Sequence, residues 1–384
     1  MKYIEYLQKL ISFSSITPDS SGSIEYVNSL LIEMGFQTKV KIFGKRDYSV
    51  MNLYASYGEG SPNICFAGHL DVVPPGELKL WNSNPFQARL DDDKIYGRGA
   101  VDMKGAIACM LAAAFDFIDN IGNSNSRDQN FGSISFLFTT DEEGDAHYGI
   151  KEMMPYLNEQ GVKIDFCILG EPTSSKFVGD QVKIGRRGSA NFTLTIYGKQ
   201  GHVAYPELAN NPITDAINIL SDIGQYEFDQ GNEIFAQTNL EITSIDVGNK
   251  VNNIIPDKIV IKFNIRFNNI QSLQTLEDSL KSLIKQHNVR YDLVNLSCSN
   301  GFYQNIDDEI KNFAKIVESV TNNKTVLSTS GGISDARFIK DYTKVVELGL
   351  LNGTAHKINE FVGIKDLQIL YELYRKILYN MLYK

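Results

Sequence analysis

Cysteine is scarce in this sequence of 384 residues, and its distribution argues against paired thiols. The four cysteines are widely spaced and form no Cys-x-x-Cys pair: they are Cys65, Cys109, Cys167 and Cys298. Three of them sit in apolar stretches, which is typical of small, reduced core residues. This usage indicates a cytoplasmic location.

Basic residues are fewer than acidic ones. The 37 lysines and arginines face 46 aspartates and glutamates, which gives a formal charge of −9. This balance, without any dense Lys/Arg block, argues against a general nucleic-acid-binding protein. It is compatible with an anionic small substrate, because a local group of arginines can oppose the overall field.

Long apolar runs are absent as well. No uninterrupted run approaches the roughly 18 residues that a membrane-spanning helix needs. Residues 1–15 mix acidic and polar residues with apolar ones, which predicts an amphipathic helix and not a signal peptide. We therefore expect neither a membrane nor a nucleic acid as a partner.

The length predicts two domains, because one hydrophobic core seldom organises so many residues. Short apolar runs that predict buried strands alternate with helical patterns such as Met103–Ile118, which indicates an α/β layer. Near residue 180 the pattern changes to half-exposed strands such as Lys258–Phe267, with helices between them, which favours a small α+β domain. We predict one catalytic domain, 1–179 and 293–384, interrupted by an inserted domain, 180–292.

Residues that carry chemistry follow the predicted strands. His69 leaves the strand Asn63–Ala67, and Asp71 could accept its second imidazole proton. The acids Glu142 and Glu143 follow the strand Ser133–Thr139. Parallel strands would deliver these groups to one edge of the sheet, although a solvated acidic turn is the simpler alternative.

Three more candidates complete the set. Glu171 ends another strand, and His356 lies on a loop. Asp102 lies at the start of a helix after Gly97-Arg98-Gly99. A helix N-cap is the alternative for Asp102, and the glycines resemble only a fragment of a dinucleotide-binding loop.

Five of these side chains offer imidazole nitrogens and carboxylate oxygens without thiolate, which suits Zn²⁺ or a similar transition metal. They suffice for two metals about 3.5–4 Å apart if one carboxylate bridges, as in many hydrolytic sites. The five are His69, Asp102, Glu143, Glu171 and His356.

The sequence resembles the zinc peptidase and deacylase superfamily that includes aminoacylase, acetylornithine deacetylase and glutamate carboxypeptidase. Within it, the motifs are most similar to those of desuccinylases that act on N-succinyl-diaminopimelate. The matching segments span nearly the whole chain: GHLDVVPPG (68–76), YGRGAVDMKG (96–105), TTDEEGDAHYG (140–149), LGEPT (169–173), KIGRRGSANF (183–192), GKQGHVAYP (198–206), NNIIP (252–256), SGGISDARF (330–338) and GTAHKINE (353–360).

The resemblance implies a mixed-sheet catalytic domain with two Zn²⁺ ions per subunit, for which Co²⁺ could substitute. Asp102 would bridge both ions, with His69 and Glu171 on one and Glu143 and His356 on the other. Glu142 would be the general base, and Asp71 would orient His69. The peptide bond after Asp102 is often cis in this family.

The inserted domain would be a lid that also forms a homodimer, so that His202 reaches the other subunit's active site. Because the expected substrate carries several carboxylates, we expect arginine side chains that bind a carboxylate through two N–H groups, and a main chain that approaches a carboxylate closely. The candidates are Arg186, Arg266 and Arg337, with Asn252, Asn253 and Gly332. For each arginine, a surface ion pair is the alternative.

One position departs from the desuccinylase pattern: Ile333 stands where a threonine is usual, which removes a polar contact to the substrate. This departure concerns the exact substrate and not the zinc chemistry. Two other functions stay open. One is another deacylase or peptidase of the same superfamily. The other is a non-catalytic metal-binding scaffold, against which the retention of Glu142 and of every expected ligand speaks.

Overall fold

The structure is a computed structural model that describes residues 1–123 and 131–383. Their contacts divide the chain into two compact units. The first comprises Met1–Ile184, Gln304–Ser328 and Ser334–Lys384; the second comprises Gly185–Tyr303 and Thr329–Ile333. The second unit runs past residue 292 because a strand that begins at Arg290 keeps its pairing to Ser299.

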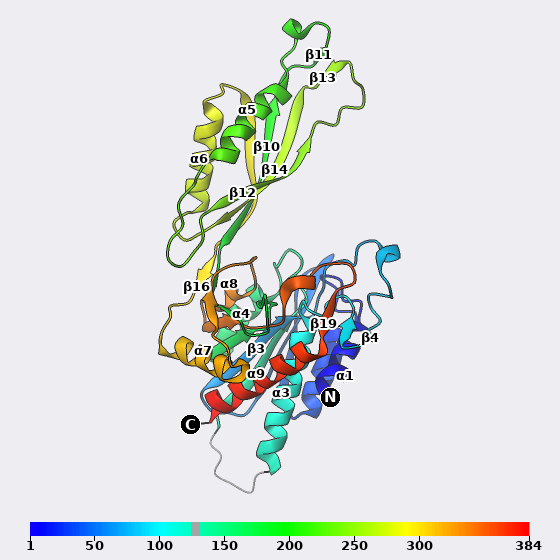
Figure 1. The fold of residues 1–384 in the computed structure, drawn as a ribbon, viewed down its shortest axis with the longest axis vertical. Helices are drawn as coiled ribbons and strands as arrows, with labels where there is room; N and C mark the ends of the chain where they lie inside the picture. Colours follow the sequence, from blue (N-terminus) through cyan, green and yellow to red (C-terminus); the bar gives the residue numbers. More distant parts are fainter. Residues whose placement is uncertain (124–130, 384) are drawn as a thin grey trace. The chain divides into compact units, whose positions relative to one another are not determined.

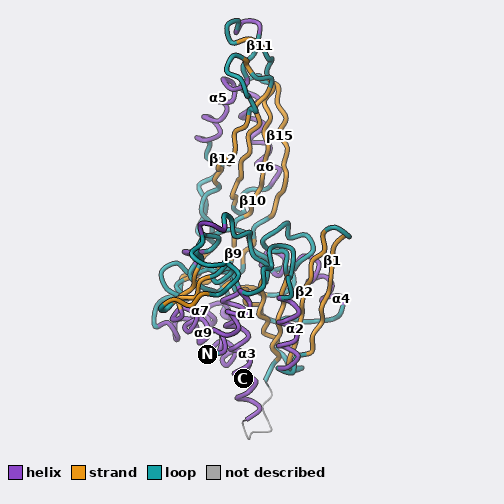
Figure 2. Tube along the Cα trace, turned by 90° about the vertical axis from the view of Figure 1, so that its right-hand side faces the viewer, coloured by secondary structure: helices purple, strands orange, loops and turns teal. Residues whose placement is uncertain are grey.

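The first unit contains the elements that begin and end the chain (Figures 1 and 2). Its helices are α1 (Lys2–Ile11), α2 (Ser23–Glu33), η1 (Leu78–Leu80), α3 (Lys104–Asn123), α4 (Ile150–Glu159), α7 (Asp308–Thr321), α8 (Ala336–Ile339), η3 (Asn352–Thr354) and α9 (Ile364–Leu382). Its strands are β1 (Gln37–Lys45), β2 (Tyr48–Tyr57), β3 (Asn63–His69), β4 (Arg89–Asp91), β5 (Lys94–Tyr96), β6 (Ser133–Thr139), β7 (Phe166–Leu169), β8 (Gln181–Lys183), β17 (Val326–Ser328), β18 (Lys344–Glu347) and β19 (Phe361–Gly363).

An eight-stranded mixed sheet in the order β1-β2-β6-β3-β7-β18-β8-β17 forms the centre of this unit. Strands β6, β3, β7 and β18 are parallel to one another, whereas β2 pairs antiparallel with both β1 and β6, and β18 pairs antiparallel with β8. Every residue of β3, β6 and β7 is buried, which is typical of parallel strands covered on both faces. The predicted α/β class with a mixed sheet is confirmed.

Helices α3 and α9 pack against each other beside this sheet (Figure 1). Alanines make α3 narrow enough for close approach, and aromatic rings join α9 to the sheet. The rings of Phe66 on β3 and Tyr374 on α9 meet edge to face, 5.1 Å apart. The central strands are thus fixed by packing, and their carboxyl ends form a rigid edge.

The second unit is an α+β layer. A four-stranded antiparallel sheet in the order β12-β14-β10-β15 packs against α5 and α6 around its own apolar core. Alternating burial along β14 accounts for this arrangement, because one face of the sheet meets the helices. Its elements are β9 (Gly185–Arg186), β10 (Gly188–Tyr197), β11 (Gly201–His202), η2 (Pro206–Leu208), α5 (Pro212–Gln225), β12 (Asn239–Asp246), β13 (Ile254–Ile255), β14 (Lys258–Phe267), α6 (Leu273–Lys285), β15 (Arg290–Ser299) and β16 (Phe302–Tyr303).

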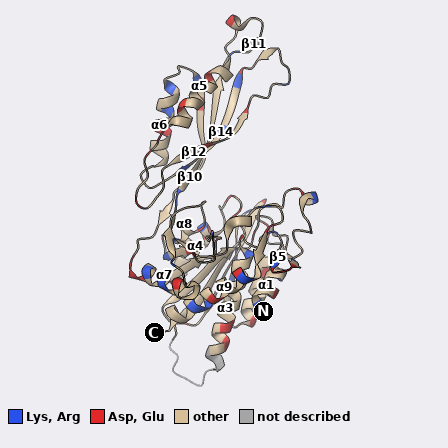
Figure 3. Cartoon of the chain, viewed as in Figure 1, with Lys and Arg blue, Asp and Glu red and all other residues tan. Residues whose placement is uncertain are grey.

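Charged side chains of both signs occur along helices such as α7 and α9 (Figure 3). Within residues 1–123 and 131–383, no helix combines the length and apolarity needed to cross a bilayer. Cys65, Cys109 and Cys167 are buried thiols, as predicted, and Cys298 is exposed.

Candidate metal centre and active site

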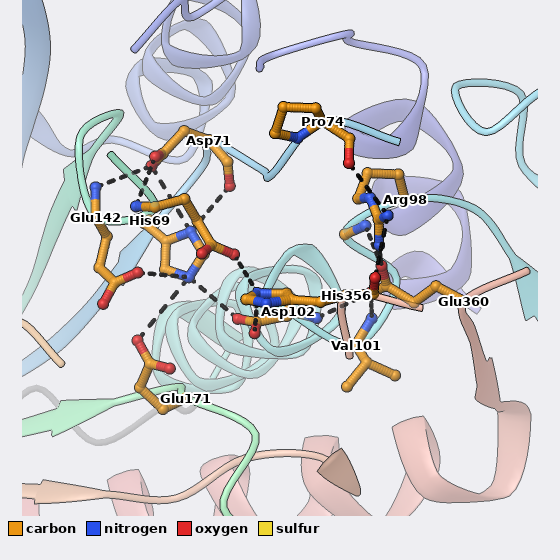
Figure 4. A network of polar contacts seen from close by, with 12 residues as sticks. His69, Asp71, Pro74, Arg98, Val101, Asp102, Glu142, Glu171, His356 and Glu360 are labelled. Atoms are coloured by element: carbon orange, nitrogen blue, oxygen red, sulfur yellow. Dashed lines mark hydrogen bonds and ion pairs between the residues drawn. The ribbon is translucent and has the colours of Figure 1, made fainter. Parts of the chain in front are cut away.

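Three parallel strands bring polar side chains to one edge of the central sheet. His69 is the last residue of β3, Glu142 and Glu143 lie in the turn after β6, and Glu171 follows β7. Because β3 pairs in parallel with both β6 and β7, these groups converge, as the sequence predicted (Figure 4). All of them belong to the first unit.

Asp102 lies between two imidazoles. Its Oδ1 is 3.2 Å from His69 Nε2, and its Oδ2 is 3.2 Å from His356 Nε2 (Figure 4). Each carboxylate oxygen therefore faces a different histidine, which is the geometry that a carboxylate bridging two cations would have. The Asp102–Met103 peptide bond is cis.

Two triads of possible ligands share Asp102. One consists of His69, Asp102 and Glu171, the other of Asp102, Glu143 and His356, and within each the ligand atoms lie within 4.8 Å of one another. Glu143 Oε1 is 2.7 Å from His356 Nε2, and Glu171 Oε1 is 3.9 Å from His69 Nε2. Ligand atoms about 2.0–2.2 Å from one tetrahedral ion are spaced on this scale, so both triads fit a zinc-sized cation.

The shared cluster perturbs the charges of its members. Burial alone would raise the pKa of Asp102, but hydrogen bonds with His356 and His69 hold it below its usual value. The same hydrogen bond to Asp102, with a second to Glu143, raises the pKa of His356 to about 10. Burial lowers the pKa of His69, but the hydrogen bond to Asp102 and the nearby Glu142 carboxylate raise it above its usual value. Divalent cations bound here would balance the same acids.

Glu142 is placed beside this cluster. Its Oε2 is 3.9 Å from His69 Nε2. Burial raises the pKa of Glu142 well above its usual value, and the nearby Glu171 carboxylate raises it further. A carboxyl group that holds its proton more tightly is suited to take a proton from a water molecule.

His69 is oriented by the residue that the sequence suggested, but through a different atom. The shorter contact of Nδ1 is with the main-chain oxygen of Asp71, at 2.9 Å, whereas the carboxylate is 3.7 Å away. The Asp71 carboxylate instead accepts the main-chain N–H groups of Glu143, at 3.0 Å, and Glu142, at 3.4 Å. Asp71 thus holds both the imidazole and the acidic turn. Burial raises its pKa to about 6, although the positive His69 opposes this.

One buried pair beside the cluster received no role in the sequence analysis. Glu360 and Arg98, with side chains 0% and 3% exposed, form an ion pair of 2.7 Å (Figure 4). Both lie inside motifs that resemble the superfamily, YGRGAVDMKG and GTAHKINE. The sequence did not predict this pair, because charged residues are seldom fully buried. Its only sequence signal was that both residues lie inside these motifs.

The remaining predicted site residues lie mostly in the second unit, where Arg186 is buried. Gly331 has a positive φ of 111°, and a side chain there would collide with the Arg186 guanidinium. Burial lowers the pKa of Arg266, as does its neighbour Arg187. The others in this unit are His202, Asn252, Asn253 and Gly332.

Arg337 belongs to the first unit, on α8. Its guanidinium lies 4.5 Å from the Phe338 ring centre and lowers the pKa of Asp335, which burial raises to about 7. In the described part of the chain, its Nε is buried and has no hydrogen-bond partner.

Known proteins are similar to this chain over nearly its whole length. A protein of Rickettsia bellii named succinyl-diaminopimelate desuccinylase is 54% identical over 382 residues, which cover 98% of this chain and 96% of that protein. A metallo-carboxypeptidase of the M20 family from Sulfolobus solfataricus has the same fold, with a TM-score of 0.79 at 17% identity over 98% of both chains. A dinuclear metal-binding peptidase of the M20 family from Bacillus subtilis also shares it, with a TM-score of 0.68 at 15% identity over 99% of this chain and 97% of that one.

The two solved structures establish only the fold, since their identities are low. The family follows from the sequence itself, because residues 65–380 match the peptidase family M20/M25/M40 and contain both candidate metal triads. This confirms the predicted resemblance, and the chain belongs to peptidase family M20/M25/M40.

Proposed function

We propose that this chain is a metal-dependent amidohydrolase that cleaves N-succinyl-LL-2,6-diaminopimelate into succinate and LL-2,6-diaminopimelate, a step of lysine and diaminopimelate biosynthesis. Two ligand triads that share one carboxylate carry the proposal of metal-dependent hydrolysis. The proposed substrate rests on the similarity to a named desuccinylase, which is 54% identical over 98% of this chain.

The proposed cofactor is a pair of Zn²⁺ ions, with Co²⁺ as a substitute. Asp102 would bridge them, His69 and Glu171 would hold one, and Glu143 and His356 would hold the other. The mixture of imidazole and carboxylate ligands without thiolate favours a borderline divalent ion of this kind. When bound, such ions polarise an amide carbonyl and acidify water.

Glu142 would act as the general base. Its carboxylate takes a proton from the attacking water and returns it to the nitrogen of the departing amine. Burial raises the pKa of Glu142 above its usual value, which supports this role because the carboxylate is then a stronger base. Asp71 contributes by holding the turn that carries Glu142.

Substrate choice would depend on the guanidinium groups of Arg186, Arg266 and Arg337, because the substrate has several carboxylates and arginine binds these with a two-pronged fork. Asn252 and Asn253 would add amide donors. Gly332, which has open space where a side chain would be, would let the main chain approach a carboxylate.

His202 would act across a homodimer formed by the second unit, the proposed lid. Its Nδ1 accepts the main-chain N–H of Ala204 at 3.0 Å. In the neutral ring the proton is then on Nε2, so the exposed side of the imidazole is a hydrogen-bond donor. Such a donor is suited to stabilise the oxyanion that forms on the amide carbonyl.

We further propose that the enzyme works in the cytoplasm. Its four cysteines are all unpaired, and three of them are buried. Free, buried cysteines are typical of proteins in reducing compartments, whereas proteins of oxidising compartments more often form disulfides.

If Glu142 is the base and Glu143 is a metal ligand, substitutions at these two positions should have different effects. Glu142→Gln keeps the shape of the side chain but cannot take a proton, so kcat should fall about 10²–10⁴-fold while both metal ions are retained. Glu143→Gln should lose metal as well as turnover, and Asp145→Asn, at an exposed acid of the same turn, should change neither. Steady-state kinetics with metal analysis checks this. More than about a tenth of wild-type kcat in Glu142→Gln would refute the role.

The role of His202 predicts complementation between two inactive variants. His202→Ala and Glu142→Gln chains, unfolded together and refolded, should form mixed dimers in which one of two sites has both intact groups. Activity should recover to about a quarter of wild type, because about half of the dimers are mixed. Each variant refolded alone is the control. A mixture as inactive as its parents would place His202 in its own subunit's site or outside any site.

The substrate proposal predicts a strong preference among N-acyl amino acids. On metal-reconstituted protein, kcat/KM for N-succinyl-diaminopimelate should exceed that for N-acetylornithine by about 10³-fold or more, since unpaired arginines penalise the smaller anion. Ile333→Thr should lower KM by up to about tenfold, because it restores a hydroxyl. Comparable rates on N-acetyl or dipeptide substrates would instead identify another deacylase or peptidase of the family.

A further inference from the structure

The buried pair of Glu360 and Arg98 lies against the proposed metal centre without belonging to its ligands. Glu360 Oε2 accepts from Arg98 Nη1 at 2.7 Å, and both side chains are almost fully shielded from water. A carboxylate at zero exposure needs all of its acceptor positions filled. Its other partners therefore show what this residue does.

These partners are the main-chain N–H groups of the loop that carries Asp102. Oε2 also accepts from Gly99, at 3.0 Å, and Oε1 accepts from Val101, at 2.8 Å, and from Asp102 itself, at 3.2 Å. The main-chain oxygen of Glu360 accepts from Gly97, at 3.0 Å. Four main-chain N–H groups between Gly97 and Asp102 thus donate to Glu360, three of them to its carboxylate (Figure 4).

Arg98 extends the same network to two more loops. Its Nη2 donates to the main-chain oxygens of Pro74 and His356, each at 3.4 Å, and its Nη1 donates to that of Lys357 at 3.3 Å. His356 has a positive φ of 61°, a backbone conformation that is uncommon for a residue with a side chain. The indole of Trp81 covers the guanidinium at 5.3 Å.

We propose that Glu360, paired with Arg98, is a positioning residue that fixes Asp102 and His356 at the separation two metal ions require, and thereby sets the affinity for the metal pair. The inference rests on the proposed function, since it takes Asp102 and His356 as ligands. A single buried carboxylate holds the loop of the bridging ligand directly and, through Arg98, the turn of a second ligand and the segment after His69. Partners that orient ligands in this way commonly change metal affinity when they are mutated.

Glu360→Gln tests this proposal most directly, because it keeps the size of the side chain and replaces one acceptor oxygen by an NH₂ group. That group would face N–H donors whichever way the amide is turned. Asp165→Asn is the matched control: its carboxylate accepts the main-chain N–H of Asn63 at 2.8 Å, at the opposite end of β3 from His69. It should alter stability without altering the metal centre.

The experiment is a competition titration of metal-free protein with Zn²⁺ against a chromophoric chelator, followed by kinetics at limiting and saturating Zn²⁺. Glu360→Gln should bind Zn²⁺ about 10–100-fold more weakly than wild type. Its kcat should be low at stoichiometric metal and recover with excess metal, with KM little changed. Asp165→Asn should keep wild-type affinity.

Wild-type Zn²⁺ affinity in Glu360→Gln, with only a lowered melting temperature, would overturn the inference and leave Glu360 a structural residue. Arg98→Lys, which keeps the charge but loses the fork, should weaken Zn²⁺ binding in the same direction and carries the test if Glu360→Gln does not fold. The emission of Trp81, the sole tryptophan, reports whether the loops around Arg98 remain packed. Absence of Zn²⁺ binding by wild type would instead refute the proposed function.

Discussion

The two-sided contact of Asp102 is the interaction on which the rest of the site depends. Its two oxygens face His69 and His356 at equal distances, 3.2 Å each, and so divide the polar cluster into two halves that share one carboxylate. Without that sharing, the remaining acids would simply repel one another in a poorly solvated place. With it, they become two ligand sets at one edge of the sheet.

The ligands come from strands and from loops, and the two kinds of segment are fixed in different ways. Parallel strands β3, β6 and β7 deliver His69, Glu143 and Glu171, and their complete burial fixes those positions by packing. Asp102 and His356 lie on loops, which packing alone would hold less firmly. A buried carboxylate that accepts several main-chain N–H groups supplies the missing constraint.

Much of this could be predicted from the sequence, because the strand ends could be read from short apolar runs. The runs Ser133–Thr139 and Lys258–Phe267 were recognisable from their apolar pattern alone and match β6 and β14. Two features could not be found in that way. The atom that orients His69 is a main-chain oxygen, which no residue type reveals, and the pairing of Arg98 with Glu360 joins residues 262 positions apart. Contacts of that range depend on the folded topology and not on local pattern.

The central claim is that one carboxylate organises a pair of divalent ions, and anomalous diffraction from crystals of the zinc-loaded protein tests it most directly. The account predicts two anomalous peaks per chain, about 3.5–4 Å apart, one on each oxygen of Asp102. A single peak, or two peaks that do not share Asp102, would contradict it.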